Sequence, residues 1–106
     1  MDEQAYLHLA DATFGRLMDA LSDVDPEVVD CERAGDVVTL TFADGRRSVL
    51  NTQRPTRQLW LAGGESAWHF SYQSTTGRWI DDKGRGELFA ILGRLVRDAS
   101  GLELDL

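Results

Sequence analysis

The 106-residue chain is 42% hydrophobic and 27% charged, a composition typical of one folded domain and inconsistent with disorder. Its net charge of −7 argues against nucleic acid and anionic membranes as partners, because affinity for phosphates comes mainly from Lys and Arg. A lone Cys excludes an internal disulfide, and neither a spanning apolar run nor a leader-like N-terminus is present, so we expect a complete cytoplasmic protein without membrane contact.

Residues 3–21 are predicted to form an amphipathic helix. Apolar side chains recur there at spacings of three and four, at Tyr6, Ala10, Phe14, Leu17 and Leu21. The opposite arc is polar and includes acidic residues. The Asp-Pro pair at 25–26 ends the helical pattern, because the residue before a proline is biased away from helical backbone angles.

From residue 28 to 81 the hydrophobic period changes to two, which is typical of β-strands. Alternation over 28–32 and 37–42 is followed by further predicted strands at about 46–52, 58–62, 67–73 and 78–81. The turns between them are short, and the Asp-Gly pair at 44–45 is a strong hairpin indicator. Short turns favour antiparallel neighbours, since a parallel crossover needs a dozen or more residues.

A second helix is predicted at about 85–99, with an apolar stripe from Leu88 to Ala99 and Gly101 as its C-terminal cap. The chain therefore reads as helix, five or six strands, helix. Two amphipathic helices and one meander predict an α+β fold, a two-layer α-β sandwich. Its N- and C-terminal helices pack on one face of a five- or six-stranded antiparallel sheet, in a single domain spanning 1–106.

Nearly all the excess negative charge lies in the first 44 residues, which carry eleven acidic and two basic residues, against seven and nine in the remaining 62. Asp19 and Asp23, four apart on the predicted helix, share a face about 6 Å apart, and Asp30 and Glu32 share a strand face. If that strand is a sheet edge beside the helix, these pairs and the 25–27 connection form one acidic ridge.

Carboxylates without a His or Cys cluster suit hard cations such as Fe³⁺, Ca²⁺ or Mg²⁺, with Fe²⁺ and Mn²⁺ also compatible. The spacing encodes no closed cage, so we expect weak, exposed sites. The alternative is a solvated helix face and edge-strand charges that prevent sheet-to-sheet aggregation. Composition alone leaves both interpretations open.

A second group of residues maps to the sheet face that the helices leave open. In the strand 58–62, Leu59 and Leu61 are expected in the core, which places Gln58 and Trp60 on the open side. Asn51, His69 and Ser71 fall on that side by the alternation of their strands. A Trp among amides there indicates either a binding hot spot or a shield for neighbouring backbone.

No residue pattern indicates catalysis. His69 has no Ser or Cys nucleophile placed with it, and Cys31 is expected to point inward as a small core residue. We therefore expect a protein that is not an enzyme.

At full length, the sequence resembles the frataxin family in its bacterial form. The matching features, in chain order, are Leu9-Ala10-Asp11, Asp30-Cys31-Glu32, Leu40-Thr41-Phe42 with Asp44-Gly45, Asn51-x-Gln53-x-Pro55-x-x-Gln58-x-Trp60-Leu61-Ala62, His69-Phe70 and Trp79-Ile80. The stretch from Asn51 to Ala62 is the most specific of these. Met18 and Ser22 stand where relatives often carry acids, which thins the ridge.

The resemblance implies a frataxin-like fold and weak, surface-bound iron, as Fe²⁺ or Fe³⁺. It also implies a role in iron–sulfur cluster assembly, as an iron sensor or donor acting on the cysteine desulfurase and its scaffold protein. The chain is expected to be a monomer, or an oligomer that assembles with iron. An acidic adaptor without metal, and an iron store or ferroxidase, are the alternatives. The implied metal-binding residues are Glu3, Asp19, Asp23, Asp25, Glu27, Asp30 and Glu32, and the implied partner-binding residues are Asn51, Gln53, Gln58 and Trp60.

Overall fold

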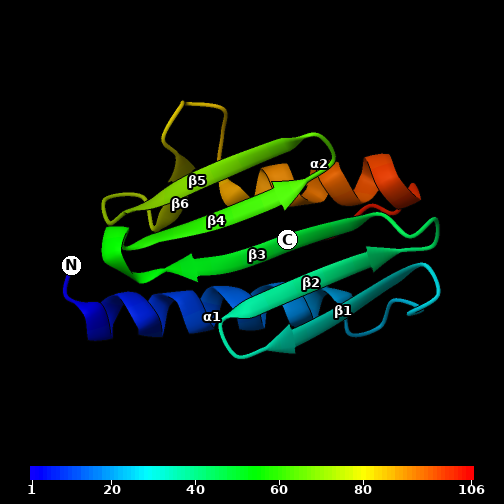
Figure 1. Cartoon of the computed structure of the whole chain (residues 1–106), viewed down its shortest axis with the longest axis horizontal. Helices are drawn as coiled ribbons and strands as arrows, with labels where there is room; N and C mark the ends of the chain where they lie inside the picture. The colour runs from blue at the N-terminus through cyan, green and yellow to red at the C-terminus, as the bar shows by residue number, and fades with distance from the viewer.

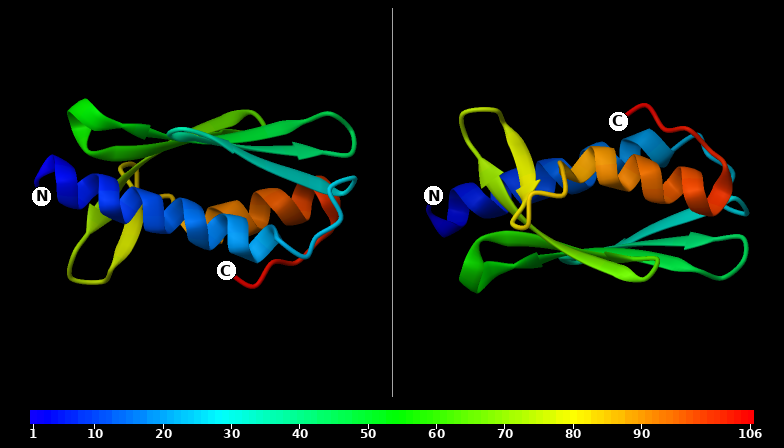
Figure 2. Two further views of the ribbon diagram at one scale, coloured as in Figure 1. Left: turned by 90° about the horizontal axis from the view of Figure 1, so that it is seen from below. Right: turned by 90° about the horizontal axis from the view of Figure 1, so that it is seen from above.

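Two helices cover one face of a six-stranded antiparallel sheet and leave the other face open (Figures 1 and 2). The computed structural model describes all residues, 1–106. The elements are α1 (Glu3–Leu21), β1 (Val29–Ala34), β2 (Val37–Phe42), β3 (Arg47–Gln53), the 3₁₀ turn η1 (Arg54–Thr56), β4 (Gln58–Gly63), β5 (Ser66–Gln73), β6 (Arg78–Asp81) and α2 (Leu88–Ser100). The strands lie in chain order, so β1 and β6 are the edges. The predicted α-β sandwich is confirmed.

The hydrophobic core lies between the sheet and the two helices and contains twenty buried apolar side chains. The helix α1 contributes its predicted apolar stripe to this core, and alternate residues of the strands point into the core from the sheet. Leu59 and Leu61 are buried as predicted, and Trp68 and Trp79 are buried beside them in the core cluster. This alternation directs the intervening residues of β3, β4 and β5 to the open face.

The helix α2 begins at Leu88, three residues later than its apolar pattern predicted. An ion pair between a buried carboxylate and an exposed arginine accounts for the difference. The carboxylate of Asp81, 3% exposed, accepts hydrogen bonds from the Arg85 side chain and from the backbone N–H groups of Lys83 and Arg85. These bonds fix a turn over 81–85, and Glu87 then caps α2 by accepting from the N–H groups of the first turn.

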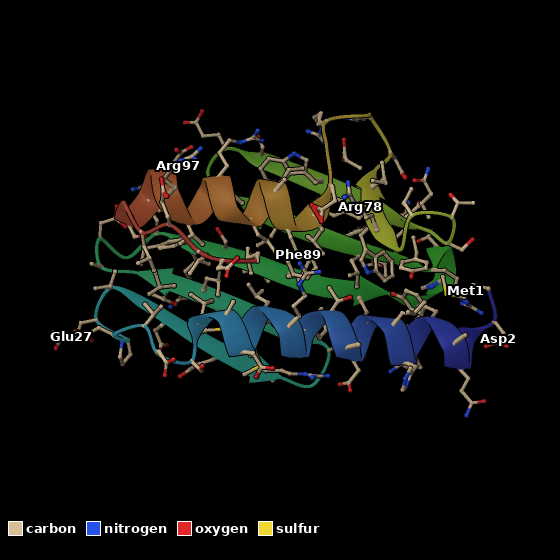
Figure 3. The ribbon with its side chains drawn as sticks, turned by 180° about the vertical axis from the view of Figure 1, so that it is seen from behind. Met1, Asp2, Glu27, Arg78, Phe89 and Arg97 are labelled. Carbon is tan, nitrogen blue, oxygen red and sulfur yellow. The ribbon has the colours of Figure 1, made fainter.

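The last residues of the chain return across the helices (Figures 2 and 3). Leu102, Leu104 and Leu106 pack in part against the core, and the Arg16 guanidinium donates to the Leu106 carbonyl. The same guanidinium lies 4.0 Å from the centre of the Phe89 ring, between the helices. No helix in the structure combines the length and the apolar character that crossing a bilayer requires.

Candidate functional site

The acidic ridge comprises Asp19, Asp23, Asp25, Glu27, Asp30 and Glu32, and it follows the end of α1 and the edge strand β1. Five of these residues are exposed and Asp30 is half-buried. Asp30 pairs with Thr41 and Glu32 with Thr39, both on the open side of the sheet, while Cys31 pairs with buried Leu40. The strand carboxylates therefore face the open side, and the remaining four lie on the end of α1 and the connection to β1.

None of the six ridge carboxylates forms an ion pair, although five other carboxylates of the chain do. Arg33 is the one basic residue in the segment of the chain that carries the ridge, and it pairs outside the ridge. Its guanidinium lies 2.6 Å from the Asp11 carboxylate and over the Phe14 ring. The negative charge of the ridge is thus uncompensated within the molecule, which costs stability through self-repulsion.

The structure corrects one detail of the predicted ridge, the placement of Asp23 on the helix. The helix α1 ends at Leu21 with Ser22 as its cap, and Asp23 lies in the turn beyond it. Helical spacing therefore does not set its distance from Asp19. Asp19 itself occupies the last turn of α1, where no basic residue offsets the negative end of the helix dipole.

Glu3 does not join the ridge. It lies in the first turn of α1, about 24 Å along the helix from Asp19 at 1.5 Å per residue. Figure 3 shows the same separation, with Met1 and Asp2 at one end of the molecule and Glu27 at the other. The Glu3 carboxylate lies 3.9 Å from Arg54, which also pairs with Asp36 at 2.9 Å.

No three His, Cys, Asp or Glu side chains anywhere in the chain are grouped closely enough to hold a metal ion together. An ion on the ridge would therefore meet at most two protein carboxylates and complete its shell with water. Such coordination is compatible with hard cations, which accept carboxylate and water oxygens, and it gives low affinity. The Cys31 thiol beside the ridge is half-buried, and desolvation raises its pKa, which disfavours thiolate ligation.

The open face carries a polar and aromatic patch, formed by Asn51, Gln53, Gln58, Trp60, His69 and Ser71. The register places Asn51, Trp60 and His69 in one row across β3, β4 and β5, with Gln53, Gln58 and Ser71 in the next row. The Trp60 and His69 rings stack with centroids 4.1 Å apart and planes 13° from parallel. The predicted shared face of Asn51, Gln58, Trp60, His69 and Ser71 is confirmed, and the register adds Gln53 to it.

Hydrogen bonds hold this open-face patch in place. The Trp60 indole Nε1 donates to Gln58 Oε1 at 3.0 Å, and Gln58 Nε2 donates to Ser71 Oγ at 3.2 Å. Gln58 Nε2 and Ser71 Oγ both donate to the carboxylate of Asp82. Asp82 could not be predicted from the sequence as part of this patch, because it follows β6 in a turn and no local pattern joins it to β4.

Behind the open-face patch, buried Tyr6 connects α1 to the ends of β3 and β4. Its hydroxyl donates to the Gln58 carbonyl at 2.5 Å and accepts from the Gln53 N–H at 3.0 Å. Burial raises the pKa of this hydroxyl, so it stays protonated and keeps its donor role. Asn51 donates to the Thr52 carbonyl. The open-face patch is therefore anchored on the core side as well as across its own surface.

The sequence matches one known protein family over nearly its full length. A family model described as a frataxin-like domain matches residues 1–102. The chain is 36% identical over 107 residues to the iron–sulfur cluster assembly protein CyaY of Delftia acidovorans, covering 98% of this chain and 96% of that protein. It is 34% identical to CyaY of Pseudomonas fluorescens, over 99% of this chain and 94% of the relative.

Solved structures agree with this match. Frataxin from Psychromonas ingrahamii superposes with a TM-score of 0.90 at 28% identity, covering 99% of this chain and 97% of that one. Trimeric frataxin from Saccharomyces cerevisiae, complexed with ferrous iron, superposes with a TM-score of 0.76 at 27% identity, covering 89% of this chain and 87% of that one.

Proposed function

This chain belongs to the frataxin family, and on that premise we propose that it binds iron weakly on its acidic ridge and regulates iron–sulfur cluster assembly. In this proposal it acts in the cytoplasm as an iron sensor or donor for the cysteine desulfurase and its scaffold protein. The relatives named as iron–sulfur cluster assembly proteins support the pathway. The yeast frataxin complexed with ferrous iron supports the metal.

The observation that carries the proposal is the uncompensated charge of the acidic ridge. Six carboxylates without an ion pair occupy one edge, next to a helix end that is itself negative. A cation bridging two neighbours, for example Asp30 and Glu32, would relieve part of this repulsion. Because two carboxylates and water form an incomplete cage, binding is weak and reversible, as a sensor or donor requires.

The same charge would attract a basic partner. We assign the acidic ridge to a basic surface of the desulfurase, and the open-face patch around Trp60 to a second contact with the desulfurase–scaffold complex. Exposed charges are screened over about 8 Å at physiological ionic strength, so salt should weaken both iron and desulfurase binding, and the latter more steeply. In this proposal the protein is a monomer without iron, and bound iron can promote its assembly into oligomers.

An iron titration followed by amide NMR tests the metal site. Fe²⁺ and Fe³⁺ are expected to perturb resonances selectively over Asp19–Glu32, and not at Glu3, which is paired with Arg54. Uniform or absent perturbation along the chain would remove iron from the proposal and leave an acidic adaptor.

The rate of Fe²⁺ oxidation should equal that in buffer, because the protein is proposed not to be an enzyme. A faster rate would instead indicate a ferroxidase.

Charge reversal tests the partner surface. Replacing Asp19, Asp23 and Glu27 with Lys should weaken desulfurase binding well beyond the roughly 1 kcal/mol of one exposed pair. The matched control reverses Glu65, Asp98 and Glu103, three carboxylates outside the ridge that form no ion pair, and so makes the same change in net charge. Equal loss in both triple variants would show that total charge, rather than the acidic ridge, drives binding.

A further inference from the structure

Asp82 lies at the centre of the hydrogen bonds that organise the open face. Its carboxylate accepts from Ser71 Oγ at 2.8 Å through one oxygen and from Gln58 Nε2 through the other. Its own N–H donates to the His69 carbonyl at 2.9 Å. Asp82 is thereby bonded to both residues that contact the Trp60 ring: His69, which stacks on the ring, and Gln58, which accepts from its indole N–H.

The donors and acceptors of this chain fix its direction. The indole Nε1–H of Trp60 can only donate, and an ionised carboxylate can only accept. Gln58, between them, must therefore present its oxygen to Trp60 and its NH₂ group to Asp82. Without the carboxylate, only the longer bond from Gln58 Nε2 to Ser71 Oγ, at 3.2 Å, would remain to hold the amide in the orientation that Trp60 needs, and Ser71 would itself lose the acceptor for its hydroxyl.

The turn that carries Asp82 is itself rigid. The neighbouring Asp81 is buried and accepts four hydrogen bonds, from Lys83 and Arg85. Asp82 is therefore presented from a fixed backbone, although its side chain is exposed. A fixed exposed carboxylate can hold Gln58 without losing much side-chain freedom when a partner binds.

We propose that Asp82 is a positioning residue of the partner-binding surface: acting through Gln58, it holds the Trp60 indole against His69 in the geometry that a partner meets. This inference rests on the proposed function, in which the open face contacts the desulfurase–scaffold complex. It also defines the partner's chemistry at this point. Because the indole N–H is already bonded to Gln58, the partner group that covers Trp60 is apolar or cationic and does not need to supply an acceptor.

The test combines two independent readouts on Asp82→Ala and Asp82→Asn. The first is the indole Nε1–H resonance of Trp60 in the free protein, which should shift in Asp82→Ala and stay near its wild-type position in Asp82→Asn, since the new amide oxygen can still accept from Gln58. The Trp79 indole, which donates to the buried Thr13 hydroxyl at 3.0 Å, is the internal control and should not move.

The second readout is the Kd for the desulfurase–scaffold complex. Asp82→Ala should raise it about tenfold, the loss expected for one hydrogen bond to a charged group, and Asp82→Asn should stay within about twofold. Asp98→Ala, which removes an unpaired carboxylate from α2, is the matched control and should leave Kd unchanged. An unmoved Trp60 resonance in Asp82→Ala overturns the inference. So does equal weakening by Asp82→Ala and Asp82→Asn, which would reveal a bare charge contact.

The two readouts also separate this inference from the proposed function. If wild-type protein does not bind the desulfurase–scaffold complex, or if Trp60→Ala binds it as well as wild type does, the open face is not a contact surface. The part of the proposed function that assigns this face to the complex is then wrong. The Trp60 resonance still decides whether Asp82 positions the indole.

Discussion

Replacing Asp19 with Asn should make the metal-free protein more stable, although the substitution removes a charged surface residue. Asp19 occupies the last turn of α1, where the helix dipole is negative and no basic residue lies nearby. A carboxylate in that position costs about 0.3–1 kcal/mol. Its unpaired acidic neighbours in the turn beyond add repulsion of the same sign.

We expect a gain of about 0.5 kcal/mol, which corresponds to a rise in Tm of about 2–4 °C for a domain of this size. Thermal unfolding followed by circular dichroism at about 10 mM and about 1 M NaCl provides the assay, because the Debye length falls from about 30 Å to about 3 Å over that range. The gain should be present at low salt and largely absent at high salt.

Added iron should reverse the order of the two proteins in thermal stability, so that wild type has the higher Tm. A ligand that binds only the folded state stabilises by RT ln(1 + [L]/Kd), or about 1.4 kcal/mol at ten times Kd. Wild type should therefore gain more from added iron than Asp19→Asn does, since the variant lacks one of the carboxylates that would hold the ion.

Glu65→Gln is the matched control, since it also removes one exposed carboxylate, in the turn between β4 and β5. An equal rise in Tm for Glu65→Gln would show that total charge, rather than the end of α1, is responsible. A lower Tm for Asp19→Asn at low salt would refute the electrostatic reasoning altogether.

Three further substitutions test the supports of the fold, each by urea unfolding. Asp81→Asn should lower the free energy of unfolding by about 2 kcal/mol at pH 7, because the side-chain hydrogen bonds and charge of Arg85, with the N–H groups of Arg85 and Lys83, outweigh burial and hold the pKa of Asp81 at about 2. The difference from wild type should vanish as the pH falls from about 4 toward 2, where the Asp81 carboxylate becomes protonated in the folded protein. Tyr6→Phe should cost about 2 kcal/mol, since the half-buried Gln53 N–H and Gln58 carbonyl both lose their partner, the buried Tyr6 hydroxyl. Leu104→Ala, in the tail that packs on the helices, should cost about 1 kcal/mol.

Each of these has a clear contrary result. A difference at Asp81 that persists at pH 2 would mean that shape rather than charge supports the turn. A neutral Tyr6→Phe would mean that water replaces the hydroxyl. A neutral Leu104→Ala, indistinguishable from a Glu103→Ala control in the same tail, would mean that the tail is not docked in solution.

The sequence predicted the elements whose residues repeat regularly. The stripe from Tyr6 to Leu21 identified α1 with the bounds that the structure has, and strict alternation identified the strands and the open face. These patterns succeed because burial acts on every third, fourth or second residue within one element. The start of α2 was missed by three residues because the Asp81–Arg85 ion pair, which a hydropathy pattern does not reveal, holds the preceding segment as a turn.

The details of the site depended on contacts between distant segments. Asp23 was placed on the helix because its spacing from Asp19 fits one, whereas capping by Ser22 ends α1 before it. Asp82 and Gln58 are 24 residues apart, and the tail residue Leu106 is 90 residues from Arg16. Periodicity carries no information about such pairs, because they exist only once the strands and helices have packed.

The order of the strands in the sheet has a consequence for how the chain folds. Each strand pairs with its immediate neighbours in sequence, so the sheet can form hairpin by hairpin through short loops whose closure costs little entropy. Folding rates rise as contacts become more local, and this meander is as local as a six-stranded sheet allows. The two helices at the chain ends are then the slow partners. Because α1 and α2 stand at opposite ends of the chain, contacts between them close the longest loop, and we expect their docking to be the step that limits the rate.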